Sequence, residues 1–286
     1  MREPMPKLLT SAQVRQYEDE GATYPIRVLP AELARKCYLE IEKGEASHGP
    51  AFRKVLRTKP HLALKWVDEL VNHAAVLDAV EDIIGPDILL YNLTLWIKDA
   101  HDSSFVGWHQ DSTYFPLDPA VQITAWIALT DSVEENGNVR YVPGSHKLGQ
   151  LRHGEQPDSG SLLSKGQHIV EPVDATIVKS ISLQPGEMSL HHTRLVHFSE
   201  PNHSARRRIG LGVSYIPTSV QCTGTVRHTA MLVRGIDRYN HFDHEPRVSA
   251  DFDPAVEPFR QDAIARYNRA RDEQVALKAK LFAAAS

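Results

Sequence analysis

The sequence predicts a mainly β protein with flanking helices, whose core is a double-stranded β-helix, a jelly-roll barrel of the cupin-like type. From Asp87 onward, short apolar or alternating runs rich in β-branched and aromatic residues follow one another, which is typical of strands. Turn sequences separate these runs, as at Glu135-Asn136-Gly137, Pro143-Gly144 and Gln184-Pro185-Gly186. Both ends of the chain have helical spacing instead. A jelly roll supported by helices accommodates this order of elements.

The first 85 residues are expected to be helical. Thr10 and Gln13 resemble a capping box ahead of SAQVRQYEDEG, and LPAELARKCYLEIEKG has helical periodicity. A third helical run, HLALKWVDELVNHAAVLDAVEDIIG, ends at Gly85-Pro86. We interpret this part as support for the barrel.

The predicted strands lie in ILLYNLTLWI, AVQITAWIALT, VRYVPG, EMSLHHTRLVHF and RIGLGVSYIP. Residues 147–180 hold a long polar stretch without periodicity, which is either an active-site lid or a disordered segment. The last segment, PFRQDAIARYNRARDEQVALKAKLF, has helical spacing with a thin apolar stripe. It is expected to pack on the barrel or on another subunit and to expose its charges.

We expect one domain, with a helical support region at 1–86, a jelly-roll core carrying the metal site at 87–220, and a C-terminal extension at 221–286. The chain has 286 residues, 42% of them hydrophobic, and a formal charge of −4, which leaves no surplus of cations for nucleic acid. No apolar run approaches the roughly 20 residues that cross a bilayer, and MREPMPKLL lacks the apolar part of a signal peptide. Cys37 and Cys222 are expected to be free thiols, which favours a cytoplasmic protein. The protein is expected to be either a monomer or a homodimer.

A metal site is predicted where Trp108-His109-Gln110-Asp111 follows a strand signal. On an extended backbone, positions i and i+2 point to the same side, so His109 and Asp111 can bind one ion. Such a pair alone is common in proteins without a metal. His197 supplies a second imidazole, and Arg208 follows eleven residues later. Two imidazoles and a carboxylate leave positions on iron for a 2-oxo acid and dioxygen, and a guanidinium can bind the distal carboxylate of 2-oxoglutarate.

These residues lie in a region, roughly 87–216, that resembles the phytanoyl-CoA dioxygenase superfamily, and within it the ectoine hydroxylase-like members. The resemblance rests on WHQD, QITAWIALTDSVEENGNVRYVPGSHK and QPGEMSLHHTRLVHFSEPNHSARRR. It implies that His109, Asp111 and His197 bind Fe(II) and that Arg208 anchors 2-oxoglutarate, with Arg206 and Arg207 as register alternatives. It also suggests that Thr124 and Asn92 lie beside the co-substrate. From the residues alone, Thr124 is equally a strand filler and Asn92 an inward polar residue.

Asp111 distinguishes two chemistries within this superfamily. Its halogenases carry a small residue in place of the carboxylate ligand, which opens a position for chloride. Because Asp111 is present here, the resemblance implies hydroxylation. Other histidines are interpreted structurally: His191 and His192 are weak alternative ligands, and His146 is expected to brace a turn.

Aromatic residues near the first ligand are the candidates for lining the pocket. We predict that Trp126 contacts the cofactor, and that Tyr91, Trp96, Trp108, Tyr114 and Phe115 contact the substrate, although most strand aromatics belong to cores. Arg234, Arg238 and His241 either reach toward an anionic substrate or belong to a structural ion-pair network.

The predicted activity is hydroxylation of an unactivated C–H bond of a small polar or zwitterionic metabolite, with Fe(II), 2-oxoglutarate and dioxygen consumed in a reaction that releases succinate and CO2. Desaturation, cyclisation or epimerisation of a natural-product intermediate uses the same ligands and co-substrate, so the sequence leaves these outcomes open. The alternative outside catalysis is a cupin-like binding module with a structural metal. The arginine anchor argues against such a module, because a structural site needs no clamp for a 2-oxo acid.

Overall fold

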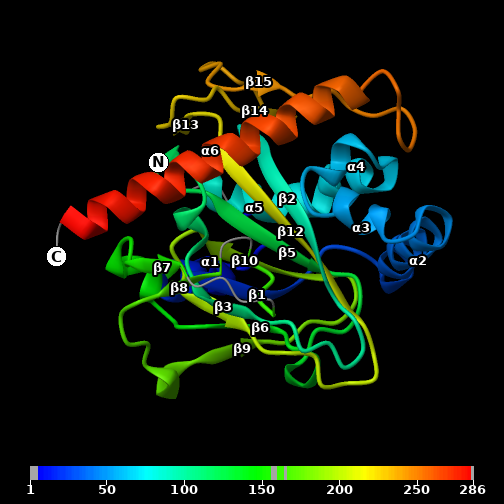
Figure 1. Cartoon of the computed structure of the whole chain (residues 1–286). Coiled ribbons are helices and arrows are strands. Elements are labelled where there is room, and N and C mark those ends of the chain that lie inside the picture. The colour runs from blue at the N-terminus through cyan, green and yellow to red at the C-terminus, as the bar shows by residue number, and fades with distance from the viewer. Residues whose placement is uncertain (1–5, 156–159, 164–165, 285–286) are drawn as a thin grey trace.

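Two facing sheets form the centre of the molecule in the computed structural model, which describes residues 6–155, 160–163 and 166–284 (Figure 1). The larger sheet has seven strands in the order β1-β10-β5-β12-β2-β14-β15, and the smaller has four in the order β3-β11-β6-β9. All pairs in the two sheets are antiparallel except β14 with β15. The predicted mainly β jelly roll with flanking helices is confirmed.

The strands run along the chain as follows: β1 Ala22–Arg27, β2 Ile88–Lys98, β3 Val106–His109, β4 Leu117–Asp118, β5 Ile123–Ala128, β6 Val139–Tyr141, β7 His153–Glu155, β8 Gln167–Ile169, β9 Lys179–Ile181, β10 Glu187–His192, β11 His197–Ser199, β12 Arg208–Pro217, β13 Gln221–Cys222, β14 Thr229–Arg234 and β15 Asp243–His244. The α-helices are α1 Ser11–Glu20, α2 Ala31–His48, α3 Ala51–Val55, α4 Lys65–Val71, α5 Ala74–Ile84 and α6 Glu257–Ala284. Short 3-10 turns are η1 Pro60–Leu62, η2 Asp111–Thr113, η3 Glu134–Asn136, η4 Ser145–Leu148 and η5 Ala175–Ile177.

The large sheet has an apolar face and a polar face because side chains alternate along each strand. On β12, Ile209, Leu211 and Val213 belong to the main hydrophobic core, together with residues of helices α2 to α5. The intervening residues Gly212 and Ser214 line a cavity inside the barrel. The helices therefore cover one face of the sheet, and the opposite face is left for a site.

The sequence predicted that the N-terminal region would be helical throughout, and this prediction is wrong for residues 22–27, which form β1. Helix α1 has the expected capping box at Thr10 and Gln13 and ends at Gly21, whose φ of 81° is left-handed. The chain then forms β1, the edge strand beside β10, with Pro25 at a register shift where the ladder loses a hydrogen bond. In the sequence ATYPIR, the apolar Tyr24 and Ile26 alternate with Thr23, Pro25 and Arg27, which is a strand signal that the helical interpretation overlooked.

Two other predicted runs are each divided in two. The third helical run forms α4 and α5, with a break at Asn72 and His73. EMSLHHTRLVHF forms β10 in the large sheet and β11 in the small one, so the connection from Thr193 to Val196 carries the chain between the two sheets.

Helix α6 runs as one long helix across the molecule (Figure 1) and contacts β14 and η2. Tyr267 and Ala270 are buried on its inner side, so the expected packing on the barrel is confirmed. Cys37 and Cys222 are both free, as predicted. None of the helices within the described ranges is long and apolar enough to cross a membrane. The single domain with its three regions, the cytoplasmic location and the oligomeric state remain predictions.

Candidate metal centre and its two cavities

The predicted ligands converge where the small sheet faces the large one. His109 is the last residue of β3 and lies directly opposite His197 of β11 in the strand register. The sequence analysis placed Asp111 on the same extended strand as His109, but in the structure Asp111 begins the turn η2. Gln110 between them is buried, and its side-chain amide donates to Gly149 O and Arg194 O. This anchoring turns the backbone and directs Asp111 toward the histidines.

The three side chains form a compact set of metal donors. One ligand atom from each of His109, Asp111 and His197 lies within 4.8 Å of the other two, and within the described part of the chain no other His, Cys, Asp and Glu cluster meets this criterion. Asp111 Oδ1 is 3.5 Å from His109 Nε2 and 3.8 Å from His197 Nε2. Two imidazoles and one carboxylate with open positions beside them are the donor set of non-haem Fe(II) oxygenases, so these residues fit iron.

Backbone carbonyls select the imidazole nitrogens that face the site. His109 Nδ1 lies 2.9 Å from Gly107 O, and His197 Nδ1 lies 2.9 Å from Leu195 O. A carbonyl only accepts, so each Nδ1 carries the proton and each Nε2 presents a lone pair. Burial lowers the pKa of His197 to about 3, which keeps this imidazole neutral and able to bind a metal.

The carboxylate of Asp111 is held by a side chain from the large sheet. Thr124 Oγ1 on β5 donates to Asp111 Oδ2 at 2.8 Å and accepts from Gln122 Nε2. Burial alone would raise the pKa of Asp111, but the neighbouring His109, His191 and His197 lower it well below its usual range. Asp111 is therefore an anion, and Thr124 orients it.

His191 is closer to this centre than the sequence suggested. Its Nε2 lies 3.7 Å from Asp111 Oδ2, and its buried Nδ1 has no hydrogen-bond partner in the described chain. His191 is nevertheless outside the compact donor set. His192 points elsewhere and packs against the rings of Tyr17 and His146. The Nε2 of His146 contacts Glu18 O, so His146 joins its turn to α1, in line with the predicted bracing role.

A small cavity of about 60 Å³ extends from the ligands to Arg208. Trp126, predicted to contact the cofactor, lines it, and the Arg208 guanidinium lies 5.5 Å from the Trp126 ring centre. Arg208 is only 2% exposed, and burial lowers its pKa to about 10, so it remains cationic. Its Nη2 reaches Ser199 Oγ at 3.5 Å, and its buried Nε has no partner among the residues described. A buried cation with unfilled donors suits an incoming carboxylate.

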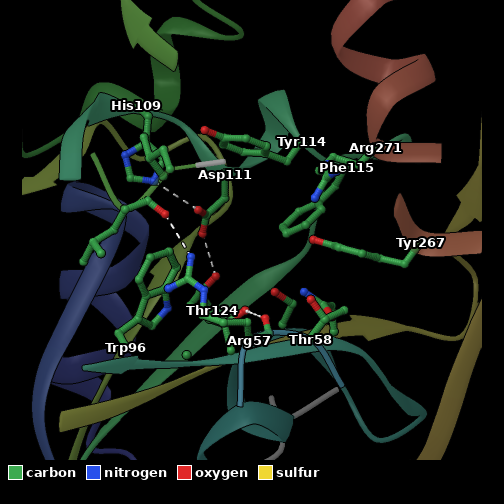
Figure 2. Close-up of a pocket in the computed structure, with 16 residues that line it drawn as sticks. Arg57, Thr58, Trp96, His109, Asp111, Tyr114, Phe115, Thr124, Tyr267 and Arg271 are labelled. Atoms are coloured by element: carbon green, nitrogen blue, oxygen red, sulfur yellow. Dashed lines mark hydrogen bonds and ion pairs between the residues drawn. The ribbon is translucent and has the colours of Figure 1, made fainter. Parts of the chain in front are cut away.

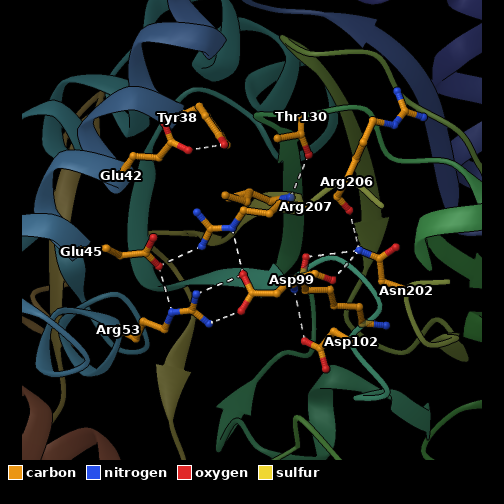
Figure 3. A network of polar contacts seen from close by, with 12 residues as sticks. Tyr38, Glu42, Glu45, Arg53, Asp99, Asp102, Thr130, Asn202, Arg206 and Arg207 are labelled. Carbon is orange, nitrogen blue, oxygen red and sulfur yellow. Dashed lines mark hydrogen bonds and ion pairs between the residues drawn. The ribbon is translucent and has the colours of Figure 1, made fainter. Parts of the chain in front are cut away.

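The two register alternatives for Arg208 are occupied elsewhere, and Figure 3 shows this for Arg207. Arg206 pairs with Asp131 on the surface, and Arg207 bridges Asp99 and Glu45. Of the three consecutive arginines, only Arg208 lines the cavity at the ligands.

A second, larger cavity of about 240 Å³ meets the first at the metal centre. Both are lined by Trp96, His109, Asp111 and Thr124. Asn92, Tyr114 and Phe115 also line the larger cavity, as predicted for the pocket. Asn92 is predicted beside the co-substrate, yet it lines the larger cavity and not the one that holds Arg208.

Two predicted substrate residues do not reach either cavity. Trp108 alternates with His109 on β3 and therefore points to the other side, where its ring packs at a tilt against Phe198 with ring centres 3.8 Å apart. Tyr91 is buried next to the inward-facing Asn92, and its hydroxyl contacts His228 Nδ1 at 2.9 Å. Both side chains serve packing.

Several residues at the larger cavity were not predicted from the sequence. Figure 2 shows the unpredicted Arg57 beside the predicted Trp96 on one side of it, and the unpredicted Tyr267 and Arg271 beside the predicted Phe115 on the other. Tyr267 and Arg271 come from α6, whose charges were expected to face solvent, so this expectation fails for Arg271. Leu162 and Leu163 also line the cavity and belong to the segment interpreted as a possible lid. The choice between a lid and a disordered segment for residues 147–180 stays a prediction, and residues 156–159 and 164–165 of that segment lie outside the described residues.

The C-terminal arginines suggested for an anionic substrate are engaged in ion pairs. Arg234 pairs with Asp78 and Glu81, and Arg238 with Asp87. None of these arginines, nor His241, lines either cavity. The structural alternative holds for both arginines.

The fold and the site together define the class of 2-oxoglutarate-dependent non-haem iron oxygenases. Residues 4–210 match the family described as phytanoyl-CoA dioxygenase (PhyH), and the chain belongs to this family. Fe(II), 2-oxoglutarate and dioxygen are accordingly its cofactor and co-substrates.

Two named relatives illustrate the range of the similarity. The chain is 29% identical over 222 residues to a probable alpha-ketoglutarate-dependent hypophosphite dioxygenase of Stutzerimonas stutzeri, covering 71% of this chain and 77% of that protein. It is 23% identical over 163 residues to L-proline trans-4-hydroxylase of Streptomyces griseoviridis, covering 51% of this chain and 61% of that one.

Solved structures share the fold over most of the chain. The non-heme monooxygenase ThoJ, in its apo form, has a TM-score of 0.83 and 31% identity, covering 92% of this chain and 99% of that one. CytC3 with Fe(II) and alpha-ketoglutarate has a TM-score of 0.64 and 19% identity, covering 86% of this chain and 96% of that one. The epimerase SnoN has a TM-score of 0.62 and 20% identity, covering 84% and 95%. The last two comparisons show the common fold.

Proposed function

We propose that this oxygenase hydroxylates a C–H bond of a small polar metabolite, with His109, Asp111 and His197 as iron ligands and Arg208 as the anchor of 2-oxoglutarate. The observation that carries the proposal is that two cavities, one ending at a buried cation, meet at the same ligand set. One cavity is available for the co-substrate and the other for the substrate, so both molecules adjoin the iron.

The protein's own groups position these molecules. His109 and His197 present neutral Nε2 lone pairs, Asp111 supplies a negative donor, and Thr124 fixes the orientation of that carboxylate. Arg208 binds the distal carboxylate of 2-oxoglutarate, which orients the 2-oxo acid end toward the ligands. When iron is bound, it supplies the chemistry that oxidises 2-oxoglutarate to succinate and CO2 with dioxygen and transfers the second oxygen atom to the substrate.

The retained carboxylate supports hydroxylation over halogenation. With Asp111 among the donors, the position that a halide needs is occupied. The size of the larger cavity, about 240 Å³, supports a small substrate, since it lies below the roughly 300–1,000 Å³ of ordinary ligand pockets. The names of the two relatives, a hypophosphite dioxygenase and a proline hydroxylase, support a small polar substrate.

The ligand assignment is tested by adding Fe(II) and 2-oxoglutarate without oxygen and recording the weak visible charge-transfer band of the chelated iron. We expect the band in the wild type and its loss in His197→Ala. The exposed His203 supplies the control, because His203→Ala should retain the band. A band that survives in His197→Ala contradicts the assignment.

The reaction type is tested on products. A screen of small metabolites for 2-oxoglutarate consumption, followed by mass spectrometry, distinguishes the outcomes: hydroxylation adds one oxygen atom, desaturation or cyclisation removes two hydrogens, and epimerisation leaves the mass unchanged. Succinate formation alone is insufficient, because uncoupled turnover also produces it.

A further inference from the structure

We propose that the substrate is a small organic anion whose acid group binds the guanidinium of Arg57, with Arg271 supplying a second positive charge. This inference rests on the proposed function and specifies its substrate class. The charges around the larger cavity support it. Arg57 and Arg271 both line it, whereas Asp111, a proposed iron ligand, is the one carboxylate among its lining residues within the described chain.

Arg57 has donors to spare. Its Nη2 donates to Leu162 O at 2.9 Å, and this is the only hydrogen bond that the guanidinium makes with described residues. A guanidinium carries five N–H donors, and among the described residues no carboxylate contacts that of Arg57. Burial lowers the pKa of Arg57 but leaves it a cation, and a desolvated cation without a counter-ion is unfavourable. An anionic ligand would remove that penalty.

The contact of Arg57 with Trp96 uses none of its N–H donors. The central carbon of the guanidinium lies over the ring of Trp96, 4.8 Å from the ring centre, which is a cation–π contact. The N–H groups not bonded to Leu162 O can therefore bind an acid group. Figure 2 shows Arg57 beside Trp96 and near Thr124, on the side of the cavity that leads to Asp111. An anion bound there would hold the rest of the molecule next to the metal centre.

The charge balance of the loaded site points the same way. The charges of Fe(II) and Arg208 are matched by Asp111 and the two carboxylates of 2-oxoglutarate. Arg57 is then uncompensated, and Arg271 is paired only with its exposed neighbour Asp272 at 3.1 Å, among the contacts described for it. Ion pairs at the surface are weak and screened, so Arg271 keeps much of its attraction for an anion in the cavity.

The test compares probes of similar size that are anionic, neutral or cationic. Protein loaded with Zn(II) and 2-oxoglutarate, which cannot turn over, is titrated calorimetrically with butyrate, propylphosphonate, butyramide and butylamine. We expect the two anions to bind and the amide and amine to bind at least about tenfold more weakly, because each lacks a charge-assisted bond to Arg57. The affinity of butyrate relative to that of propylphosphonate then shows whether the site prefers a carboxylate or a phosphorus oxyanion.

Variants assign the effect to the side chain. Arg57→Gln should weaken anion binding about ten- to hundredfold, Arg271→Gln less, and Arg57→Lys should retain most of it. Arg15→Gln on α1 removes the same charge from an exposed position outside the cavity and should change nothing. Thermal melts of each variant check folding, and the comparison of butyrate with butyramide on the wild type keeps the test decisive if Arg57→Gln does not fold.

Three results would overturn the inference: no binding of either anion at the solubility limit, butyramide binding as tightly as butyrate, or equal anion affinity in wild type, Arg57→Gln and Arg57→Lys. The proposed function is read separately, from the binding of 2-oxoglutarate before any probe is added. If 2-oxoglutarate does not bind, that function fails, whereas intact 2-oxoglutarate binding with no preference for anions rejects only the substrate class.

Discussion

The two nitrogens of each ligand imidazole have different partners, and this division makes the residues chemically competent. In His109 and His197 the Nδ1 is occupied by the carbonyl of the residue two positions earlier, Gly107 or Leu195. The same local geometry therefore selects the same tautomer in both strands. A histidine at the right position but with a free Nδ1 would exist partly in the wrong tautomer and bind metal less well.

Arg208 should be the residue on which 2-oxoglutarate affinity depends. Arg208→Gln removes a buried cation whose Nε has no partner in the described chain, so we expect the dissociation constant of 2-oxoglutarate to rise about ten- to hundredfold. The anaerobic charge-transfer band, titrated with 2-oxoglutarate, measures it.

The matched control is Arg206→Gln, two positions away. Its side chain is 61% exposed and pairs with Asp131, so its loss should leave the affinity unchanged. Equal effects of the two substitutions would show that general positive charge, and not Arg208 itself, attracts the co-substrate.

Among the elements, strand β12 contributes core residues on one face and lines the cavity at the metal ligands on the other. Ile209 and Leu211 pack into the main core, while Arg208 faces the smaller cavity at the ligands. Gly210 lies on the same inner side as Arg208, and a Cβ there would lie 2.0 Å from the ring of Trp126. The glycine thus provides the space in which the indole lies beside Arg208.

Substitution of this glycine should damage both stability and co-substrate binding. Gly210→Ala forces Trp126 to move, and overpacking of this kind costs about 1–3 kcal/mol of unfolding free energy. We also expect weaker 2-oxoglutarate binding, since Trp126 lines that cavity. Urea unfolding and the charge-transfer titration measure the two effects.

Gly107→Ala on β3 is the corresponding control. Its added Cβ would meet Gln167 O at 3.6 Å, an ordinary contact, so both measurements should stay close to wild type. If Gly210→Ala behaves no differently from Gly107→Ala, the indole is not packed as described.

Helix α6 is the element for which the sequence prediction and the structure differ most. Its spacing indicates a charged helix with a thin apolar stripe, and Arg266 with Asp262 does form a surface pair. Yet Tyr267 and Arg271 line the larger cavity, and the Lys278 ammonium donates to Ser112 O and Gln150 Oε1 next to η2. The helix therefore completes a wall of the site.

At the scale of the whole molecule, a buried ion pair joins the N-terminal region to the C-terminal extension. Glu245 accepts from Lys59 and from Thr229 Oγ1, and its other oxygen is 2.6 Å from His61 Nε2. Burial alone would raise the pKa of Glu245, but Lys59 and His61 lower it to about 2. The carboxylate is therefore charged at neutral pH and connects segments about 180 residues apart in the chain.

Breaking this pair from one side should destabilise the protein strongly. Glu245→Gln leaves Lys59 buried without a counter-ion, which costs about 3–5 kcal/mol of unfolding free energy in a urea titration. Glu257→Gln, which breaks a partly exposed pair with Arg260, should cost less than about 1 kcal/mol.

Removing both charges together provides a further check. Lys59→Met with Glu245→Leu leaves no unpaired charge and should recover much of the stability that Glu245→Gln loses. A Glu245→Gln variant as stable as Glu257→Gln would mean that the pair does not hold the two regions together.

The sequence by itself determined the class of fold, the family and the positions of His109, Asp111, His197 and Arg208. These features depend on local rules: alternation along strands, turn residues between them, and short motifs whose residues stay close together in any strand-like arrangement. Even the detail that Asp111 begins a turn leaves the ligand set unchanged, because His109 and Asp111 remain two positions apart.

Only the tertiary structure decided which side chains form the larger cavity. Arg57 follows a short helix and Arg271 lies within a long charged one, so neither stands in a pattern that indicates a site. Trp108 and Tyr91 have the expected aromatic character but point away from the cavities. The reason is that a cavity wall is assembled from segments distant in the chain, and which side of each segment faces inward depends on how helices and sheets pack.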